Sequence, residues 1–146
     1  MAVPTDRTTY ATLYAEVQQF YAEHIWFLDE GIVEEAVMTF TEDATMLSPP
    51  KVPEPIRGRA NLRAGLRRAA DALAAEGIRY RRCHTMVSVV PEPGGDLHVR
   101  AYVQVVRTPR GGASVLHAMC VCEDVLVRED GRLKVRRRVV TRDELR

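Results

Sequence analysis

The stretch LHVRAYVQVVRTPRGGASVLHAMCVCEDVLV, residues 97–127, decides the fold. Both of its halves are rich in β-branched residues, and Thr-Pro-Arg-Gly-Gly at 108–112 separates them with the composition of a turn. This pattern predicts two antiparallel strands, over residues 97–107 and 114–127, joined by a hairpin. Turns at 91–95 (Pro-Glu-Pro-Gly-Gly) and 129–131 (Glu-Asp-Gly) predict two further strands, over residues 78–90 and 133–141.

Three helices are predicted before these strands. Apolar residues recur at intervals of three and four over residues 9–28, 32–40 and 59–75, which is the spacing of amphipathic helices, and Gly77 is well placed to end the third. A short strand is predicted at residues 44–47, and four prolines within residues 48–58 predict an irregular loop. Helices followed by an antiparallel meander indicate an α+β fold, in which the helices bury their apolar sides on one face of the sheet.

Size and charge indicate a small soluble domain. The chain has 146 residues, 46% of them hydrophobic, which is enough for one core, so a single domain over residues 1–146 is expected. Lys and Arg number 21 against 20 for Asp and Glu, so no overall field attracts nucleic acid or an anionic membrane. The sequence has no signal-peptide pattern and no apolar run of about 20 residues. We expect a cytoplasmic protein that binds neither nucleic acids nor membranes.

No cofactor and no metal ion are expected. The three cysteines, Cys83, Cys120 and Cys122, lack the spacing of metal ligands and fit a reducing compartment. The sequence contains neither the G-x-G-x-x-G fingerprint of dinucleotide-binding folds nor a P-loop, and the Gly-Gly pairs at 94–95 and 111–112 are typical of hairpin turns.

Alternation along the strands predicts which side chains face the helices. The odd-numbered residues of 97–105 are all apolar, and extending the odd set into the next strand places His117, Met119 and Glu123 on the same inner face. A carboxylate there costs several kcal/mol unless it is paired or protonated, so Glu123 is a candidate acid or base with a raised pKa. The alternative is that Glu123 pairs with Arg137, which shares its parity with Leu133.

The even-numbered residues of 116–126 are also rather apolar. This indicates that the outer side of this strand is covered as well, and we expect a second subunit to cover it. The expected assembly is a homodimer.

Two polar residues lie near the end of the first predicted helix. The helix C-terminus favours a protonated imidazole at His24, and Asp29 could orient a histidine or abstract a proton. The alternative for both is an ordinary solvated or packing residue. His84 lies on the first long strand, where parity does not decide its direction because a bulge would reverse it.

Four stretches together resemble the SnoaL-like branch of the NTF2-like superfamily. They are FLDEGIVEEAVMTFTEDATM (27–46), PIRGRANLRAGL (55–66), CHTMVSVV (83–90) and CEDVLVREDGRLKVRRRVV (122–140). The resemblance implies a cone in which the helices and a curved sheet enclose a pocket. It also implies one of three roles: a cofactor-independent cyclase, dehydratase or isomerase for polyketide-like substrates; the non-catalytic small subunit of an aromatic-ring-hydroxylating dioxygenase; or a ligand-binding domain.

The resemblance also suggests site residues. Asp29 and His84 are similar in placement to the aspartate and histidine of scytalone dehydratase-like enzymes, whereas a further histidine and an asparagine of those enzymes fall on residues 108–110 and on Cys122. The general-base aspartate of ketosteroid isomerases falls on Ser48, and their oxyanion-hole tyrosine and acid fall on His24 and Glu123. The candidate catalytic residues are Asp29, His84, Glu123 and His24. The candidates for binding a substrate are His117, Tyr21, Met119 and Arg137.

Overall fold

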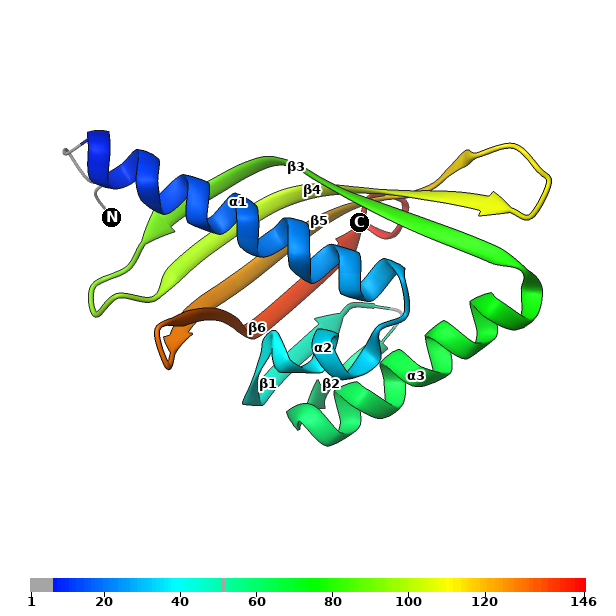
Figure 1. The fold of residues 1–146 in the computed structure, drawn as a ribbon, viewed down its shortest axis with the longest axis horizontal. Coiled ribbons are helices and arrows are strands. Elements are labelled where there is room, and N and C mark those ends of the chain that lie inside the picture. The colour runs from blue at the N-terminus through cyan, green and yellow to red at the C-terminus, as the bar shows by residue number, and fades with distance from the viewer. Residues whose placement is uncertain (1–6, 51) are drawn as a thin grey trace.

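Six strands form one curved, unclosed sheet in the order β2-β1-β6-β5-β4-β3 (Figure 1). The computed structural model describes residues 7–50 and 52–146. The strands are β1 (Phe40–Ser48), β2 (Val52–Arg57), β3 (Ile78–Pro91), β4 (Leu97–Pro109), β5 (Val115–Glu129) and β6 (Arg132–Arg142). The pairing of β1 with β6 is parallel, and the other pairings are antiparallel.

The helices are α1 (Arg7–Asp29), α2 (Val33–Met38) and α3 (Gly58–Glu76), and a short 3-10 helix η1 (Asp143–Leu145) follows β6. All three helices pack on one side of the sheet (Figure 1). The α+β class, the three helices and the four long strands predicted from the sequence are therefore confirmed. Gly77 ends α3 as expected, because its φ of 67° is a left-handed conformation that glycine adopts without strain.

The predicted loop over residues 48–58 is partly wrong. Residues 52–57 form β2, which lies at the edge of the sheet and, among the described residues, pairs only with β1. Prolines are tolerated in an edge strand, since their missing N–H groups can face away from the neighbouring strand. The predicted strand at residues 44–47 is also longer than expected and begins at Phe40.

Helix α1 is held against β3 by its tyrosines as well as by its apolar side. The hydroxyl of Tyr14 donates to the carbonyl oxygen of Val87 at 2.9 Å, and that of Tyr10 donates to Val89 O at 3.3 Å. These carbonyls follow a bulge at Met86, whose φ is 52°. The bulge that the sequence left open is therefore present, and α1 is anchored directly beyond it.

The main core lies between the sheet and the helices α1 and α3. Its buried residues are Val17, Tyr21, Phe40, Ala44, Leu62, Val89, Leu97, Val99, Leu126, Leu133 and Val135. A second cluster continues along the sheet through Val103, Ala118, Cys120 and Cys122.

Within residues 7–50 and 52–146, no helix is long and apolar enough to cross a membrane. The hairpin between β4 and β5 reaches beyond the C-terminal end of α1 (Figure 1).

Candidate functional site

Strand β5 presents its even-numbered residues to the helices, so the predicted parity of this strand is wrong. Ala101 pairs directly with Cys122, and Val99 with Asp124. Directly paired residues of antiparallel strands point to the same side, so Cys122 and Asp124 share the inner face with the odd residues of β4. Both are buried, and Asp124 is 0% exposed.

Glu123 consequently lies on the outer face and not in the pocket predicted for it. Its side chain is 49% exposed, and its Oε2 lies 3.7 Å from Nε2 of His98. Met119 pairs with Gln104 and also faces outward. The predicted partner Arg137 is exposed as well, because a bulge in the pairing of β5 with β6 reverses the parity after Val135.

His117 is the extra residue of another bulge, between β4 and β5. It is exposed, and its ring stacks on that of Tyr80 with centroids 5.3 Å apart. The Tyr80 hydroxyl and Nε2 of His117 are 3.3 Å apart. His117 therefore lies near the open end of the sheet and not among the buried side chains.

The bulge in β6 turns Arg138 inward, where it forms a buried ion pair with Asp124. Its Nε donates to Oδ1 at 2.8 Å and its Nη2 to Oδ2 at 2.7 Å. Tyr21 O–H donates to the same carboxylate at 2.8 Å, and the Cys122 thiol donates at 3.4 Å. Burial alone would raise the pKa of Asp124, but the charge and hydrogen bonds of Arg138 outweigh it and hold that pKa below its usual value.

Tyr21 is the one predicted binding residue that the structure places deep inside the fold. Its burial, followed by the negative charge of Asp124, raises its pKa well above the usual value. The side chain is therefore a phenol at neutral pH, and its proton is directed at Asp124.

His84 also points inward, since it pairs with the buried Val103. Its ring stacks on Tyr21 with centroids 4.8 Å apart and an interplanar angle of 22°. Burial, assisted by the positive charge of Arg138, lowers the pKa of His84 to about 4, so the imidazole is neutral at pH 7. Both ring nitrogens are buried, and neither has a hydrogen-bond partner among the described residues.

His24 is 0% exposed and lies beside the same group. Its Nδ1 is 2.7 Å from the Oγ of Thr39, while its buried Nε2 has no partner among residues 7–50 and 52–146. Burial and then the charge of Arg138 lower the pKa of His24 well below the usual value. The protonated imidazole predicted from the helix terminus is therefore wrong, because desolvation outweighs the helix dipole. Tyr21, His24, His84, Asp124 and Arg138 are called the buried polar cluster below.

Asp29 does not contact His84. Its side chain is 4% exposed and is held by Arg82, whose backbone N–H donates to Oδ2 at 3.0 Å and whose Nη1 donates to Oδ1 at 2.5 Å. Arg82 lies two residues before His84 on β3, and alternation places both side chains on the inner face. Asp29 is therefore the partner of Arg82, which lies beside His84, and not of His84 itself.

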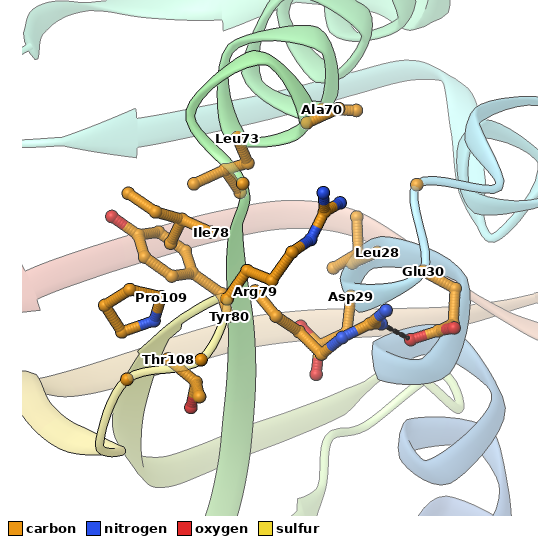
Figure 2. A pocket seen from close by; sticks show the side chains of 16 residues that line it. Leu28, Asp29, Glu30, Ala70, Leu73, Ile78, Arg79, Tyr80, Thr108 and Pro109 are labelled. Carbon is orange, nitrogen blue, oxygen red and sulfur yellow. Dashed lines mark hydrogen bonds and ion pairs between the residues drawn. The ribbon is translucent and has the colours of Figure 1, made fainter.

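A pocket of about 510 Å³ opens at the ends of α1 and α3 (Figure 2). Asp29, Glu30, Arg79 and Tyr80 supply polar groups to its wall, and the other labelled side chains are mostly apolar. Tyr80, Arg82 and His84 follow one another on the inner face of β3, so this row leads from the pocket toward the buried polar cluster. His24, His84 and Glu123 do not line the pocket.

Acid is expected to destabilise the protein through the two buried histidines. Between pH 6.5 and about 4 the unfolded chain binds a proton at His84 but the folded chain does not. The free energy of unfolding should therefore fall as the pH is lowered through this range, by about 3 kcal/mol from His84, with a further decrease from His24. Urea titrations of the wild type and of His84→Phe at pH 7 and pH 4.5 measure the difference. Equal decreases in both proteins would contradict the assignment.

Comparison with known proteins places this architecture in a family. Residues 9–139 match the family model of the SnoaL-like domain. The structure of ActVI-ORFA from Streptomyces coelicolor is similar at 30% identity and a TM-score of 0.83, covering 91% of this chain and 98% of that one. Aln2 from another Streptomyces strain is 29% identical with a TM-score of 0.85, covering 99% of this chain and 96% of that one.

A protein from Catenulispora acidiphila, solved in complex with S-DNPA, is 32% identical with a TM-score of 0.78, covering 92% of this chain and 96% of that one. No curated protein matches the sequence. The NTF2-like cone predicted from the sequence is confirmed by the six-stranded sheet and by the similar fold of an NTF2-like protein from Novosphingobium aromaticivorans, which is 19% identical with a TM-score of 0.76. With the family model matching most of its length, the chain belongs to the SnoaL-like domain family.

Proposed function

We propose that the protein is a cofactor-independent acid–base enzyme, a cyclase, dehydratase or isomerase, for a polyketide-like small molecule. The observation that carries this proposal is the set of three buried imidazole nitrogens without partners among the described residues, two on His84 and one on His24. Buried polar atoms in folded proteins nearly always have hydrogen-bond partners. A substrate with several oxygen atoms would supply partners for these nitrogens.

His84 is the acid–base group in this proposal. Because its imidazole is neutral at pH 7, it can accept a proton from a carbon next to a carbonyl group and return that proton to another position of the substrate. The stacking on Tyr21 fixes the plane of its ring. Proton transfer of this kind is common to aldol cyclisation, dehydration and isomerisation.

The electrostatics of the interior favour the enolate that such a transfer produces. The charges of Arg138 and Arg82 both lower the pKa values of His24 and His84, which means that they create a positive potential around those rings. The same potential stabilises a developing negative charge on a substrate oxygen. Asp124 fixes Arg138 in place through two hydrogen bonds.

Asp29 acts in this proposal by holding Arg82, and the pocket of Figure 2 is the entrance for the substrate. An oxygen-rich end of the substrate entering between α1 and α3 would meet Arg82 before His84, because Arg82 precedes it along the inner face of β3. The S-DNPA bound to the Catenulispora relative supports a small-molecule role for this chain.

The test is turnover by the purified protein in a buffer that contains a metal chelator and no added cofactor. Aromatic poly-β-ketones and their hydroxylated, partly cyclised derivatives serve as substrates, and NMR identifies the products. Exchange of a substrate α-proton for deuterium, faster than in buffer alone, is the minimum result expected. Tight uptake without exchange or conversion would indicate a ligand-binding domain, and entry into a stable complex with a dioxygenase large subunit would indicate the structural role. Either result would contradict the proposal.

We also propose that the outer face of the sheet pairs with a second copy of the chain. Tyr102 is 45% exposed there, and it lines a groove of about 670 Å³ together with Met119 and Val121. Arg100 and Glu123 lie directly opposite each other in the same groove. A two-fold axis that passes through this groove would bring the Arg100 of one copy close to the Glu123 of the other. Sedimentation equilibrium should give a dimer that Tyr102→Arg dissociates, whereas a monomeric wild type would contradict the proposal.

A further inference from the structure

We propose that His24 is a specificity-determining residue that accepts a hydrogen bond from a hydroxyl group of the ligand. This inference rests on the proposed function for the location of the ligand, next to the buried polar cluster. It adds that one subsite presents a hydrogen-bond acceptor and therefore requires a donor on the ligand. The ligand class that follows is a phenol or an enolised polyketide with a free O–H, in place of a fully ketonic or O-alkylated molecule.

The contacts of Thr39 determine the tautomer of His24. A threonine hydroxyl has one proton, and the Oγ of Thr39 donates it to the carbonyl oxygen of Ala36 at 2.5 Å. Toward His24 the same Oγ can therefore act only as an acceptor. At 2.7 Å from it, Nδ1 must carry the proton of the neutral ring. Nε2 then has a lone pair and no proton.

The orientation of the ring is fixed from both sides. Phe20 stacks on His24 with centroids 5.5 Å apart at 9°, and Phe40 meets it at 5.4 Å and 68°. With this packing and the bond to Thr39, a ring flip that exchanges the nitrogens would break the hydrogen bond. Nε2 is thus held in one direction inside the fold, and none of the described residues donates to it.

A fixed acceptor discriminates between donors and acceptors on a ligand. A hydroxyl proton satisfies the lone pair of Nε2, whereas a carbonyl or ether oxygen would leave two unpaired acceptors facing each other. His84 does not discriminate in this way, because none of the described residues bonds to either of its nitrogens and either tautomer is available. The two histidines therefore have different roles: His24 recognises the hydroxyl group of the ligand, and His84 exchanges the proton.

The experiment compares 1-naphthol with 1-methoxynaphthalene, two probes that differ in the O–H donor. Titrations followed by calorimetry should show about tenfold tighter binding of 1-naphthol by the wild type. His24→Phe should abolish this preference, and His84→Phe, as the matched control, should retain it. Thr39→Val keeps the shape of the side chain and the His24 ring but removes the acceptor for Nδ1–H, so it should also reduce the preference.

Long-range proton–nitrogen NMR provides a second readout that does not depend on the variants. Free protein should show Nδ1 of His24 protonated and Nε2 unprotonated, and 1-naphthol should shift the Nε2 resonance. Equal affinities for the two probes, a proton on Nε2, or an Nε2 resonance that 1-naphthol leaves unchanged would each overturn the inference. Turnover is a separate readout: a naphthol-dependent shift without any turnover refutes the proposed function alone, and turnover without that shift refutes the role of His24 alone.

Discussion

Replacing His84 with phenylalanine is expected to lower kcat by a factor of about 100 or more, because a positioned acid–base group contributes roughly 10²–10⁴ in rate. Phenylalanine keeps the stacking on Tyr21 and the volume of the ring but removes both nitrogens. Steady-state kinetics on the substrate identified by the turnover test measures the loss. An increase in KM with kcat unchanged would mean that His84 binds the substrate without exchanging its proton.

The pH dependence of kcat/KM separates this role from a structural one. Because the pKa of His84 is about 4, the wild type should keep its activity at pH 5.5, where an ordinary histidine is mostly protonated. Glu123→Gln is the matched control, since this carboxylate is half exposed on the outer face, and its kcat should stay within about twofold of the wild type. Loss of activity centred near pH 6.5 would contradict the assignment.

The sequence predicted the elements well because the signals for them are local. Gly-rich turns at 91–95 and 108–112 and the helical spacing before Gly77 act within a few residues, and the structure confirms them. The inner face of β4 was also predicted correctly, since its alternation is uninterrupted. The register between the strands could not be predicted from the sequence, because it depends on the positions of β-bulges.

Those bulges decide the site. A one-residue bulge between β4 and β5 leaves His117 exposed and makes the even residues of β5 face inward, so that Asp124 takes the buried position predicted for Glu123. A second bulge, in β6, directs Arg138 inward and leaves Arg137 exposed. Glu123 and Asp124 are adjacent and both carry a carboxylate, so the sequence alone does not show which of them is buried. Only the register between the strands distinguishes them.

His24 and His84 were predicted as site residues, but their charge state was not. Their neutrality follows from the burial of His24 and of the ring nitrogens of His84 near Arg138, and neither the burial nor the arginine is visible from helix position or strand parity. Arg82 was missed altogether, and the hydrogen bonds that tie it to Asp29 explain why Asp29 is not the partner of His84. The sequence signal was present, since Arg82 and His84 have the same parity on β3.

Replacing Arg138 with methionine is expected to lower the free energy of unfolding by about 3–5 kcal/mol, because it leaves the carboxylate of Asp124 buried without a countercharge. This destabilisation is the free-energy cost of burying an unpaired carboxylate, and it does not equal the contribution of the ion pair to stability. The double variant Asp124→Leu/Arg138→Met removes both charges from the same space and should recover most of the loss. Urea unfolding at pH 7 measures all three free energies.

Arg137→Met is the matched control, since Arg137 is the adjacent residue on the same strand but is exposed, and its change should stay within about 0.5 kcal/mol. If Arg138→Met and Arg137→Met had similar effects, the inward direction of Arg138 and the bulge that produces it would be wrong. If the double variant were as unstable as Arg138→Met, lost packing around Phe40, over which the Arg138 guanidinium lies at 5.6 Å, would account for the effect in place of the unpaired charge. The fold therefore depends on the register of β6 through one buried charge pair, and the same pair sets the potential at His24 and His84.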